Sequence, residues 1–424
     1  MLQTFFEKLK LVATDEGLRR RILFVIGALI FFRLLAAIPI PGVDTFQLEQ
    51  FFSNNQFLGL LNVFSGGGLS NLSIVMLGVA PYITSSIIMQ VMTILSPRLK
   101  ALYQEEGEAG RRRFTNYSRL LTVPLAFLQA FAFLSLLSRQ GIVPSLDLFG
   151  FATNVIIIAA GSVLLMWIGE LITEFGIGNG VSLIIFAGIV AGLPTTISQL
   201  LFSFDPAQIP LYIAFIVVAI LITLGVVVVT EAERPIPITY AKRVRGMKVY
   251  GGVSTYLPLR VNQAGVIPII FALSILLFPQ MVLNFLVNIH SSIITTISSV
   301  ILSGLSNQWV YGALYFILVF LFTYFYTAVT FDPDSIATNL QKSGAFIPGV
   351  RPGQTTSSYI GRVLTRITLV GALFLGFIAI LPLIMRGITG ITALAIGGTA
   401  LLIAVSVILD LLRKIDAQIS IREY

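Results

Sequence analysis

Long apolar runs alternate along the chain with short segments that hold most of its charged side chains. Each run has about 17 to 25 residues, which is enough for a helix to cross about 30 Å of hydrocarbon. Strands of a membrane β-barrel would show short alternating patterns instead. The pattern therefore predicts about ten membrane-spanning helices, near residues 22–40, 74–95, 118–138, 152–173, 181–202, 210–230, 265–286, 308–329, 363–385 and 391–411.

The composition supports this prediction. Hydrophobic residues make up 56% of the 424 residues and charged residues only 11%, and the mean hydropathy is +0.93. A water-soluble core could not bury so much apolar surface, so an integral membrane protein is expected. The chain has no cysteine, which excludes disulfides, thiolate catalysis and cysteine-metal sites.

The positive charge predicts the orientation of the helices. Of the 27 Lys and Arg residues, 24 lie in the N-terminal segment, in alternate loops or after the last span. Loops rich in Lys and Arg stay in the cytoplasm, so both termini are predicted to be cytoplasmic. The opposite loops hold only Arg139 and Arg386. The net charge of +8 therefore points to partners on the cytoplasmic face.

Two features indicate an internal repeat. The long loops 41–73 and 231–264 each follow the first helix of a five-helix half, on opposite sides of the membrane. The motif GVAPYI at 78–83 also corresponds to GVIPII at 265–270, each in the second helix of its half. Two inverted halves, 1–202 and 203–424, are therefore predicted, with the working site between them. The prolines, Pro81 and Pro268, either loosen these helices or simply lie near their starts.

Residues suited to catalysis are few. Arg33, Glu170 and Asp410 lie near helix ends, where long side chains reach the interface or cap a neighbouring helix. The single histidine, His290, is expected to be a solvated residue of an outer loop. The glycines of EFGIGNG, 174–180, form no nucleotide motif and predict a tight turn. No catalytic residue, metal site or cofactor is expected.

Some isoleucines could line a pore, although their spacing alone does not require it. Ile83 and Ile87 are four residues apart, as are Val181 and Ile185, so each pair lies on one helix face. Packing against lipid or other helices explains such a face equally well.

Seven segments in order nevertheless resemble the SecY family, whose members form the central subunit of a protein-conducting channel: FSGGGLSNLSIVMLGVAPYITSSIIMQ, EGEAGRRRFTNYSR, GIGNGVSLIIFAGIVAGLP, YAKRVRG, STYLPLRVNQAGVIPIIFA, FIPGVRPGQTT and GGTALLI. The resemblance implies an all-α polytopic fold with an hourglass pore between the two halves. It also implies a short plug at about 62–71, before the second span. The plug residues would be Asn62, Phe64, Ser65, Gly66, Gly67, Gly68, Leu69, Ser70 and Asn71.

The resemblance further implies a pore ring and a lateral gate. The gate would form where the second and third helices meet the seventh and eighth, with polar groups at Thr84, Ser85, Ser86 and Gln90. A ring of branched apolar residues can exclude ions by dewetting and still make no specific bond to a passing polypeptide. The ring would consist of Ile83, Ile87, Val181, Ile185, Ile270 and Ile403.

Partners are implied on the same basis. The cytoplasmic loops 231–264 and 331–362 would dock the ribosome or the SecA motor ATPase, and small SecE-like and SecG-like membrane subunits would complete the channel. The contacts would be Lys242, Arg243, Arg245, Lys248 and Arg351. Met247 stands where many members have a basic residue, so Lys248 is expected to make that contact. The positive-inside rule alone also explains these charges.

The function expected from these residues is a passive channel in the inner (plasma) membrane. It would translocate unfolded secretory polypeptides, recognise signal sequences and release apolar segments sideways into lipid. The alternatives are a secondary transporter, which would need a polar site at the midplane, and an intramembrane hydrolase or lipid-modifying enzyme. The latter would need a nucleophile with its base, or metal ligands, at membrane depth.

Overall fold

A helix lies over each of the ten predicted spans. The computed structural model describes residues 15–41, 68–69, 71–104, 106–139, 147–202, 209–240, 243–245, 248–250, 254–286, 292–389 and 392–423. The ten helices are α2 (Glu16–Ala36), α5 (Ala80–Leu95), α7 (Gly107–Arg139), α8 (Leu148–Phe175), α9 (Gly180–Phe202), α10 (Ile209–Glu231), α11 (Ile267–Leu286), α13 (Gln308–Thr330), α15 (Gln354–Thr389) and α16 (Thr392–Glu423). Three shorter helices accompany them, α6 (Pro97–Gln104), α12 (Ser292–Ser306) and α14 (Pro333–Lys342). The predicted polytopic helical fold is confirmed.

Several helices are longer than the apolar runs that predicted them. Helix α7 begins at Gly107, α15 begins at Gln354 and α16 continues to Glu423. Hydrophobicity indicates only the part of a helix that lies in lipid. The helix itself can continue beyond the lipid as a polar segment, because its backbone hydrogen bonds form in water as well. By length and composition, five stretches of the described chain suffice to cross a membrane: Gly107–Ser138, Leu148–Phe175, Tyr212–Glu231, Gln308–Lys342 and Gln354–Met385.

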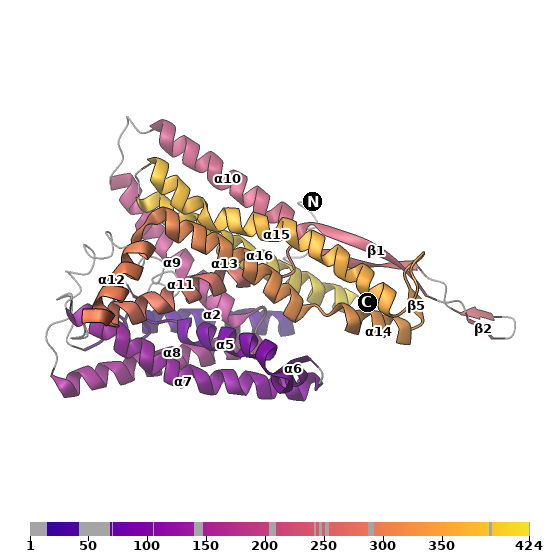
Figure 1. Ribbon diagram of the computed structural model, residues 1–424, viewed down its shortest axis with the longest axis horizontal. Coiled ribbons are helices and arrows are strands. Elements are labelled where there is room, and N and C mark those ends of the chain that lie inside the picture. Colours follow the sequence, from indigo (N-terminus) through magenta and orange to yellow (C-terminus); the bar gives the residue numbers. More distant parts are fainter. Residues whose placement is uncertain are drawn as a thin grey trace.

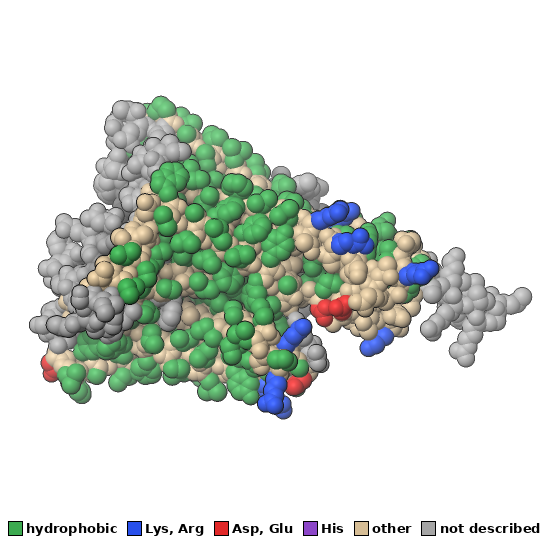
Figure 2. All heavy atoms as spheres, in the orientation of Figure 1, with side chains coloured by type: hydrophobic (Ala, Val, Ile, Leu, Met, Phe, Trp, Pro, Cys, Tyr) green, Lys and Arg blue, Asp and Glu red, His purple; other side chains and the backbone are tan. Residues whose placement is uncertain are grey.

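One continuous apolar core connects the two predicted halves. It contains buried residues of α5 and α8 from the first half and of α11, α13 and α16 from the second. Figure 1 shows these helices running in broadly the same direction, with α7 and α8 along one side and α10 along the other. Hydrophobic side chains cover the middle of the visible face, and Lys and Arg gather toward the end that carries α6, α14 and β5 (Figure 2). This distribution is typical of a membrane protein with one basic surface.

The beginning of α2 and the end of α16 lie at the same end of the helical bundle. Leu18 of α2 packs against Ile419 of α16 and against Ile177, which lies in the turn between α8 and α9. All three are buried. An even number of membrane-spanning helices places the two ends of the bundle on the same side, as observed here.

The two long segments that the positive charge assigns to the cytoplasm, 231–264 and 331–362, contribute strands to one sheet. Strands β1 (Glu233–Tyr240) and β4 (Ser254–Arg260) form an antiparallel pair in which Ile236 lies opposite Leu257. Strand β5 (Ala345–Phe346), from the second segment, pairs with the other edge of β1. Buried Ile236 and Leu259 then pack with Ile360 of α15. The two segments therefore form one small β-sheet unit beside the N-terminal end of α15, from which β2 (Arg243–Arg245) and β3 (Lys248–Tyr250) project.

Candidate pore, plug anchor and gate

The two copies of the repeated motif have the same backbone structure. Gly78 and Gly265 both adopt positive φ, 57° and 62°, a conformation that suits glycine. The helix begins two residues later in each case, so Pro81 and Pro268 are second residues of α5 and α11. Proline is favoured in the first turn because the amide it lacks would have no partner there. Of the two readings of these prolines, the one that places them at helix starts is therefore correct.

The repeated motif places an isoleucine at the same point of each helix. The amide of Ile83 donates to the carbonyl of Val79 at 3.0 Å, and that of Ile270 donates to the carbonyl of Val266 at 3.3 Å. Helices α5 and α11 also pack against each other. The first turns of these two helices, one from each half, are therefore built alike.

The six predicted ring residues lie in one apolar region. Ile83 and Ile270 are each 6% exposed, and Ile185 is fully buried. Val181 is half-buried and packs against the same core. The set comes from four helices, α5, α9, α11 and α16, of which α9 also packs against α16. A closed pore requires such apolar, buried side chains where it is narrowest. All six share one core: Ile83, Ile87, Val181, Ile185, Ile270 and Ile403.

Only part of the predicted plug can be located. Gly68, Leu69 and Asn71 are described, and Gly68 and Leu69 are buried. The Asn71 amide donates to the carbonyl of Ala36 at 3.5 Å. The other plug positions lie outside the described residues: Asn62, Phe64, Ser65, Gly66, Gly67 and Ser70.

The segment after the plug, 71–79, is not the helix that hydrophobicity predicted from residue 74. It runs as a series of turns beside the segment after α2, because Ile40 donates to the Leu72 carbonyl at 2.8 Å and Ile74 donates to the Ile38 carbonyl at 2.9 Å. Leu72 itself has φ 40°, a strained value for a residue other than glycine. We call residues 71–79 the plug anchor.

Helix α8 holds the plug anchor in place. Gly161 lies so close that a Cβ there would be 2.1 Å from the carbonyl oxygen of Ile74. One residue further, the Ser162 hydroxyl donates to the carbonyl of Gly78 at 2.6 Å. Val75 and Val79 are fully buried. The anchor is therefore fixed by close packing and by hydrogen bonds, and only a glycine at 161 permits the approach.

The predicted gate residues form hydrogen bonds within the first half. Ser85 of α5 donates to the carbonyl of Ser118 in α7, and the Gln129 side chain of α7 donates to the Thr84 hydroxyl at 3.4 Å. Gln90 donates to Ser86 at 3.3 Å within α5. Both α5 and α7 pack against α11. The polar groups of Thr84 and Ser85 thus fasten α5 to α7.

Gln129 belongs to this cluster, although it was absent from the predicted gate. Its side chain is 4% exposed in the middle of the apolar part of α7. A lone amide in an apolar span needs a partner at membrane depth. The position of Gln129 as a lone amide among apolar residues is therefore the feature of the sequence that could have indicated a gate residue.

An ion pair also joins α7 to α8. Arg119 donates to Glu170 at 2.6 Å, with side chains 44% and 16% exposed. From its place near a helix end, Glu170 is predicted to reach the interface or to cap a neighbouring helix, and the structure gives it Arg119 as a partner instead. Antiparallel neighbouring helices bring the beginning of one beside the end of the next, so a basic residue in the N-terminal part of α7 meets a carboxylate near the C-terminal end of α8.

The basic contact residues lie on two separate structures. Arg243, Arg245 and Lys248 belong to the β2–β3 hairpin, in which Arg245 lies opposite Lys248, and Lys242 lies outside the described residues. Arg351 is exposed on a turn whose glycines, Gly349 and Gly353, have positive φ of 82° and 96°. The Thr356 hydroxyl donates to the Arg351 carbonyl at 2.8 Å and closes this turn.

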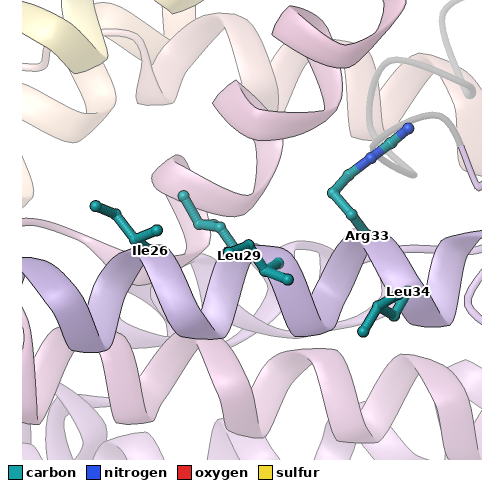
Figure 3. A pocket seen from close by; sticks show the side chains of 5 residues that line it. Ile26, Leu29, Arg33 and Leu34 are labelled. Carbon is teal, nitrogen blue, oxygen red and sulfur yellow. The ribbon is translucent and has the colours of Figure 1, made fainter.

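A pocket on α2 is poorly suited to a polar substrate. Its volume is about 510 Å³, and its lining consists of Ile26, Leu29, Ile30, Arg33 and Leu34. Figure 3 shows Ile26 and Arg33 pointing to the same side of the helix. A transporter site would need several convergent polar groups. Within the described part of the chain, no group of three or more His, Cys, Asp or Glu could hold a metal, and His290 lies outside it.

Comparison with known proteins decides the family. A family model described as SecY matches residues 73–412. The protein translocase subunit SecY of Mycobacterium tuberculosis (strain H37Rv) is 42% identical over 446 residues, which cover 100% of this chain and 99% of the relative. That of Escherichia coli (strain K12) is 43% identical over 417 residues, covering 96% and 93%. The chain belongs to the SecY family.

Solved structures agree with the fold. A protein-conducting channel is similar with a TM-score of 0.67 and 20% identity, over 94% of this chain and 92% of that one. A SecY protein whose plug domain stabilises the closed state of its channel gives a TM-score of 0.65 at 20% identity, with the same coverage. Sec61 of a canine ribosome–channel complex from the endoplasmic reticulum gives 0.62 at 19% identity, again over 94% and 92%. The chain thus has the SecY fold.

The family match covers most of the predicted site. Every predicted ring, gate and docking position lies within residues 73–412. The predicted plug at 62–71 precedes this range. The full-length relatives do cover it, and the plug assignment remains what the family resemblance implies.

Proposed function

We propose that this SecY-family chain is the channel-forming subunit of a protein translocase and that it is not an enzyme. The observation that carries the proposal is the full-length similarity to SecY translocase subunits. The six predicted ring residues support it, because they share one buried apolar core built from both halves. Unfolded polypeptide would pass between the halves, 1–202 and 203–424.

The pore ring excludes ions in the closed state. Its members, Ile83, Ile87, Val181, Ile185, Ile270 and Ile403, are branched and apolar. They offer no hydrogen bond or charge to a passing chain, so they do not discriminate among sequences. A narrow apolar constriction also sheds water and blocks ions.

The plug closes the outer side of this ring. Its predicted residues, 62–71, run directly into the fixed anchor at 71–79. A fixed anchor lets the preceding segment swing without unfolding α5. The plug of the similar SecY protein stabilises the closed state of its channel and maintains a membrane seal, and we assign the same role here.

The lateral gate opens between α11 and the α5–α7 pair. The hydrogen bonds of Thr84 and Ser85 hold α5 and α7 together as one unit. Apolar side chains of both units, Ile83 and Ile87 of α5 and Ile270 of α11, share one core, and lipid tails can replace apolar contacts at little cost. Signal sequences and apolar segments would leave through this opening.

The basic cytoplasmic structures dock the partner that drives transport. Arg351 is exposed, and the β2–β3 hairpin contains Arg243, Arg245 and Lys248; basic residues of this kind suit ribosomal RNA or an acidic protein face. The similar Sec61 was solved in a ribosome–channel complex. A ribosome or SecA would bind here, and SecE-like and SecG-like subunits would complete the channel in the inner (plasma) membrane, with both termini cytoplasmic.

Disulfide trapping tests the channel directly, because the chain has no native cysteine. Ile83→Cys is combined with a stalled secretory chain that carries one cysteine, and the complex is oxidised. A disulfide is expected, because the polypeptide passes the ring. The control is Ile220→Cys, on a side chain of α10 that is 55% exposed on the outer surface. A stalled but engaged chain that never links to Ile83→Cys, Ile185→Cys or Ile270→Cys would refute the pore and favour a solute transporter.

A further inference from the structure

Helix α12 differs in position and direction from the spanning helices. It joins α11 to α13, lies at the end of the molecule opposite the β-sheet unit and runs steeply across the neighbouring helices (Figure 1). It packs against both α11 and α13. With 15 residues at about 1.5 Å each, it is too short to span a bilayer.

Three different strips of side chains follow the length of α12. One strip faces the protein, where Ser298 is only 2% exposed. A second strip is apolar and exposed, with Ile297 at 55%, Val300 at 64% and Ile301 at 43%. The spacing of these three residues, i, i+3 and i+4, puts them on one face.

The third strip is polar and exposed. It consists of Thr296, Ser299 and Ser303, which also recur at helical spacing. The Ser299 hydroxyl donates to the Thr296 carbonyl at 2.9 Å, and the Ser303 hydroxyl donates to the Val300 carbonyl at 2.8 Å. A helix that lies in a membrane interface needs one face for lipid and another for water, and α12 has both in addition to its protein face.

The surroundings of the apolar strip identify what covers it. Helix α13 begins just after α12 and continues with exposed apolar side chains, among them Val310, Ile317 and Leu321. At their outer limit stands Trp309, which is 77% exposed, and tryptophan is enriched where a span meets the headgroups. The apolar strip of α12 thus continues the lipid-facing surface of a spanning helix at the level of its interfacial tryptophan.

The sequence around α12 is poor in charge. From residue 261 to residue 331 it has no Asp, Glu, Lys or Arg. This composition favours an apolar partner for the strip over one held by ion pairs. Lipid acyl chains need none, because apolar area alone drives their contact.

We propose that α12 is an interfacial helix, inserted into the membrane surface opposite the basic loops, with Ile297, Val300 and Ile301 among the lipid acyl chains. Thr296, Ser299 and Ser303 face the headgroups and water. The helix holds the adjoining ends of α11 and α13 at one depth. Because α11 carries Ile270 and faces the α5–α7 pair, the membrane surface supports one side of the proposed gate.

Fluorescence quenching in vesicles tests this placement. Single-cysteine variants Ile297→Cys, Val300→Cys and Ile301→Cys carry a small environment-sensitive fluorophore, and Ser299→Cys and Ser303→Cys serve as matched controls on the same helix. The full-length chain, assembled with its membrane subunits, is reconstituted in phosphatidylcholine vesicles. Shallow nitroxide-labelled phosphatidylcholine should quench the first three sites strongly and aqueous iodide should quench them weakly. The two serine sites should show the reverse order.

Two results would overturn the proposal. Strong iodide quenching at all five sites would place the apolar strip in water. Protection of Ile297→Cys, Val300→Cys and Ile301→Cys from both quenchers would mean that protein, either a partner subunit or a second copy, covers it. Adding anionic phospholipid should preserve the order of quenching at the five sites, since α12 itself has no charged residue, and a reversal of that order would contradict insertion by apolar side chains. None of these readouts depends on polypeptide transport, so the channel proposal stands or fails separately.

Discussion

Ile83 and Ile270 occupy equivalent positions in two helix starts of matching structure, and each is 6% exposed. We predict that the double variant Ile83→Asn with Ile270→Asn weakens the closed state. A buried amide without partners costs about 1–3 kcal/mol per site, and this penalty is relieved when the pore wets. Ion conductance in planar bilayers should rise, and a defective signal sequence should be exported more efficiently.

The matched control for this variant keeps the side chains apolar. Ile83→Leu with Ile270→Leu preserves volume and hydrophobicity, so conductance and signal stringency should stay near those of the parent chain. An Asn variant that folds and conducts no more than the Leu variant would argue against a ring at these positions.

Gly161 shows how one missing side chain fixes the plug anchor. A Cβ at this position would lie 2.1 Å from the Ile74 carbonyl oxygen, so Gly161→Ala should push the anchor away from α8. We predict a loss of stability of about 1–3 kcal/mol, as for other overpacked sites. Thermal unfolding in detergent should show the lower midpoint, and reconstituted channels should show a larger ion leak.

Gly27→Ala in α2 is the control for that experiment, because nothing lies within 4 Å of a Cβ there. It should be neutral or slightly stabilising, since alanine favours helix. Equal effects of the two substitutions would show that the close contact with Ile74 does not hold the anchor.

Helices α7 and α8 are joined by Arg119 and Glu170, whose side chains are 44% and 16% exposed. We predict a coupling of about 1 kcal/mol in a double-mutant cycle with Arg119→Gln and Glu170→Gln, because solvent at Arg119 screens the pair. The pair of Arg260 with Glu233, 45% and 39% exposed, should couple by only about 0.3 kcal/mol. Thermal unfolding of the four proteins of each cycle provides the measurement, and equal couplings would assign no special role to the α7–α8 pair.

The spanning helices could be predicted from the sequence because lipid imposes a single strong rule on them. Each needs a long apolar run, and all ten predicted runs coincide with helices. Helix starts depend on local chemistry as well. The start of α5 at Ala80 follows from Gly78 with positive φ and Pro81 in the first turn. Hydrophobicity alone placed that start at residue 74, inside the plug anchor.

Contacts between distant segments could not be predicted in the same way. The pairing of β1 with β5 joins residues about a hundred positions apart, and neither strand has a distinctive pattern. Helix α12 could not be predicted as a span either, because with 15 residues it is too short to cross a membrane. For the site, the ring residues are predicted by resemblance, whereas the partner of Gln129, Thr84, and the approach of Gly161 to Ile74 appear only when helices are packed.

The molecule as a whole separates an apolar middle from one basic end (Figure 2). The positive-inside rule assigns one side of the molecule to the cytoplasm. The β1–β4–β5 unit, Arg351 and both ends of the described bundle lie on that side. Orientation in the membrane and partner docking therefore draw on the same charges. An experiment that separates the two roles must compare two variants that change the net charge equally, of which only one alters the proposed contact.

Arg351 and Lys342 allow that separation, because both are exposed on the same cytoplasmic segment. We predict that Arg351→Glu weakens binding of ribosomes or SecA about tenfold, equivalent to about 1.4 kcal/mol, because its turn is fixed by Gly349, Gly353 and Thr356. Lys342→Glu changes the net charge equally and should have a much smaller effect. Binding to reconstituted channels at several salt concentrations provides the measurement, and the loss should be largest at low salt. Equal losses for the two variants would mean that partners sense only the overall charge, and the assignment of Arg351 as a contact would then be wrong.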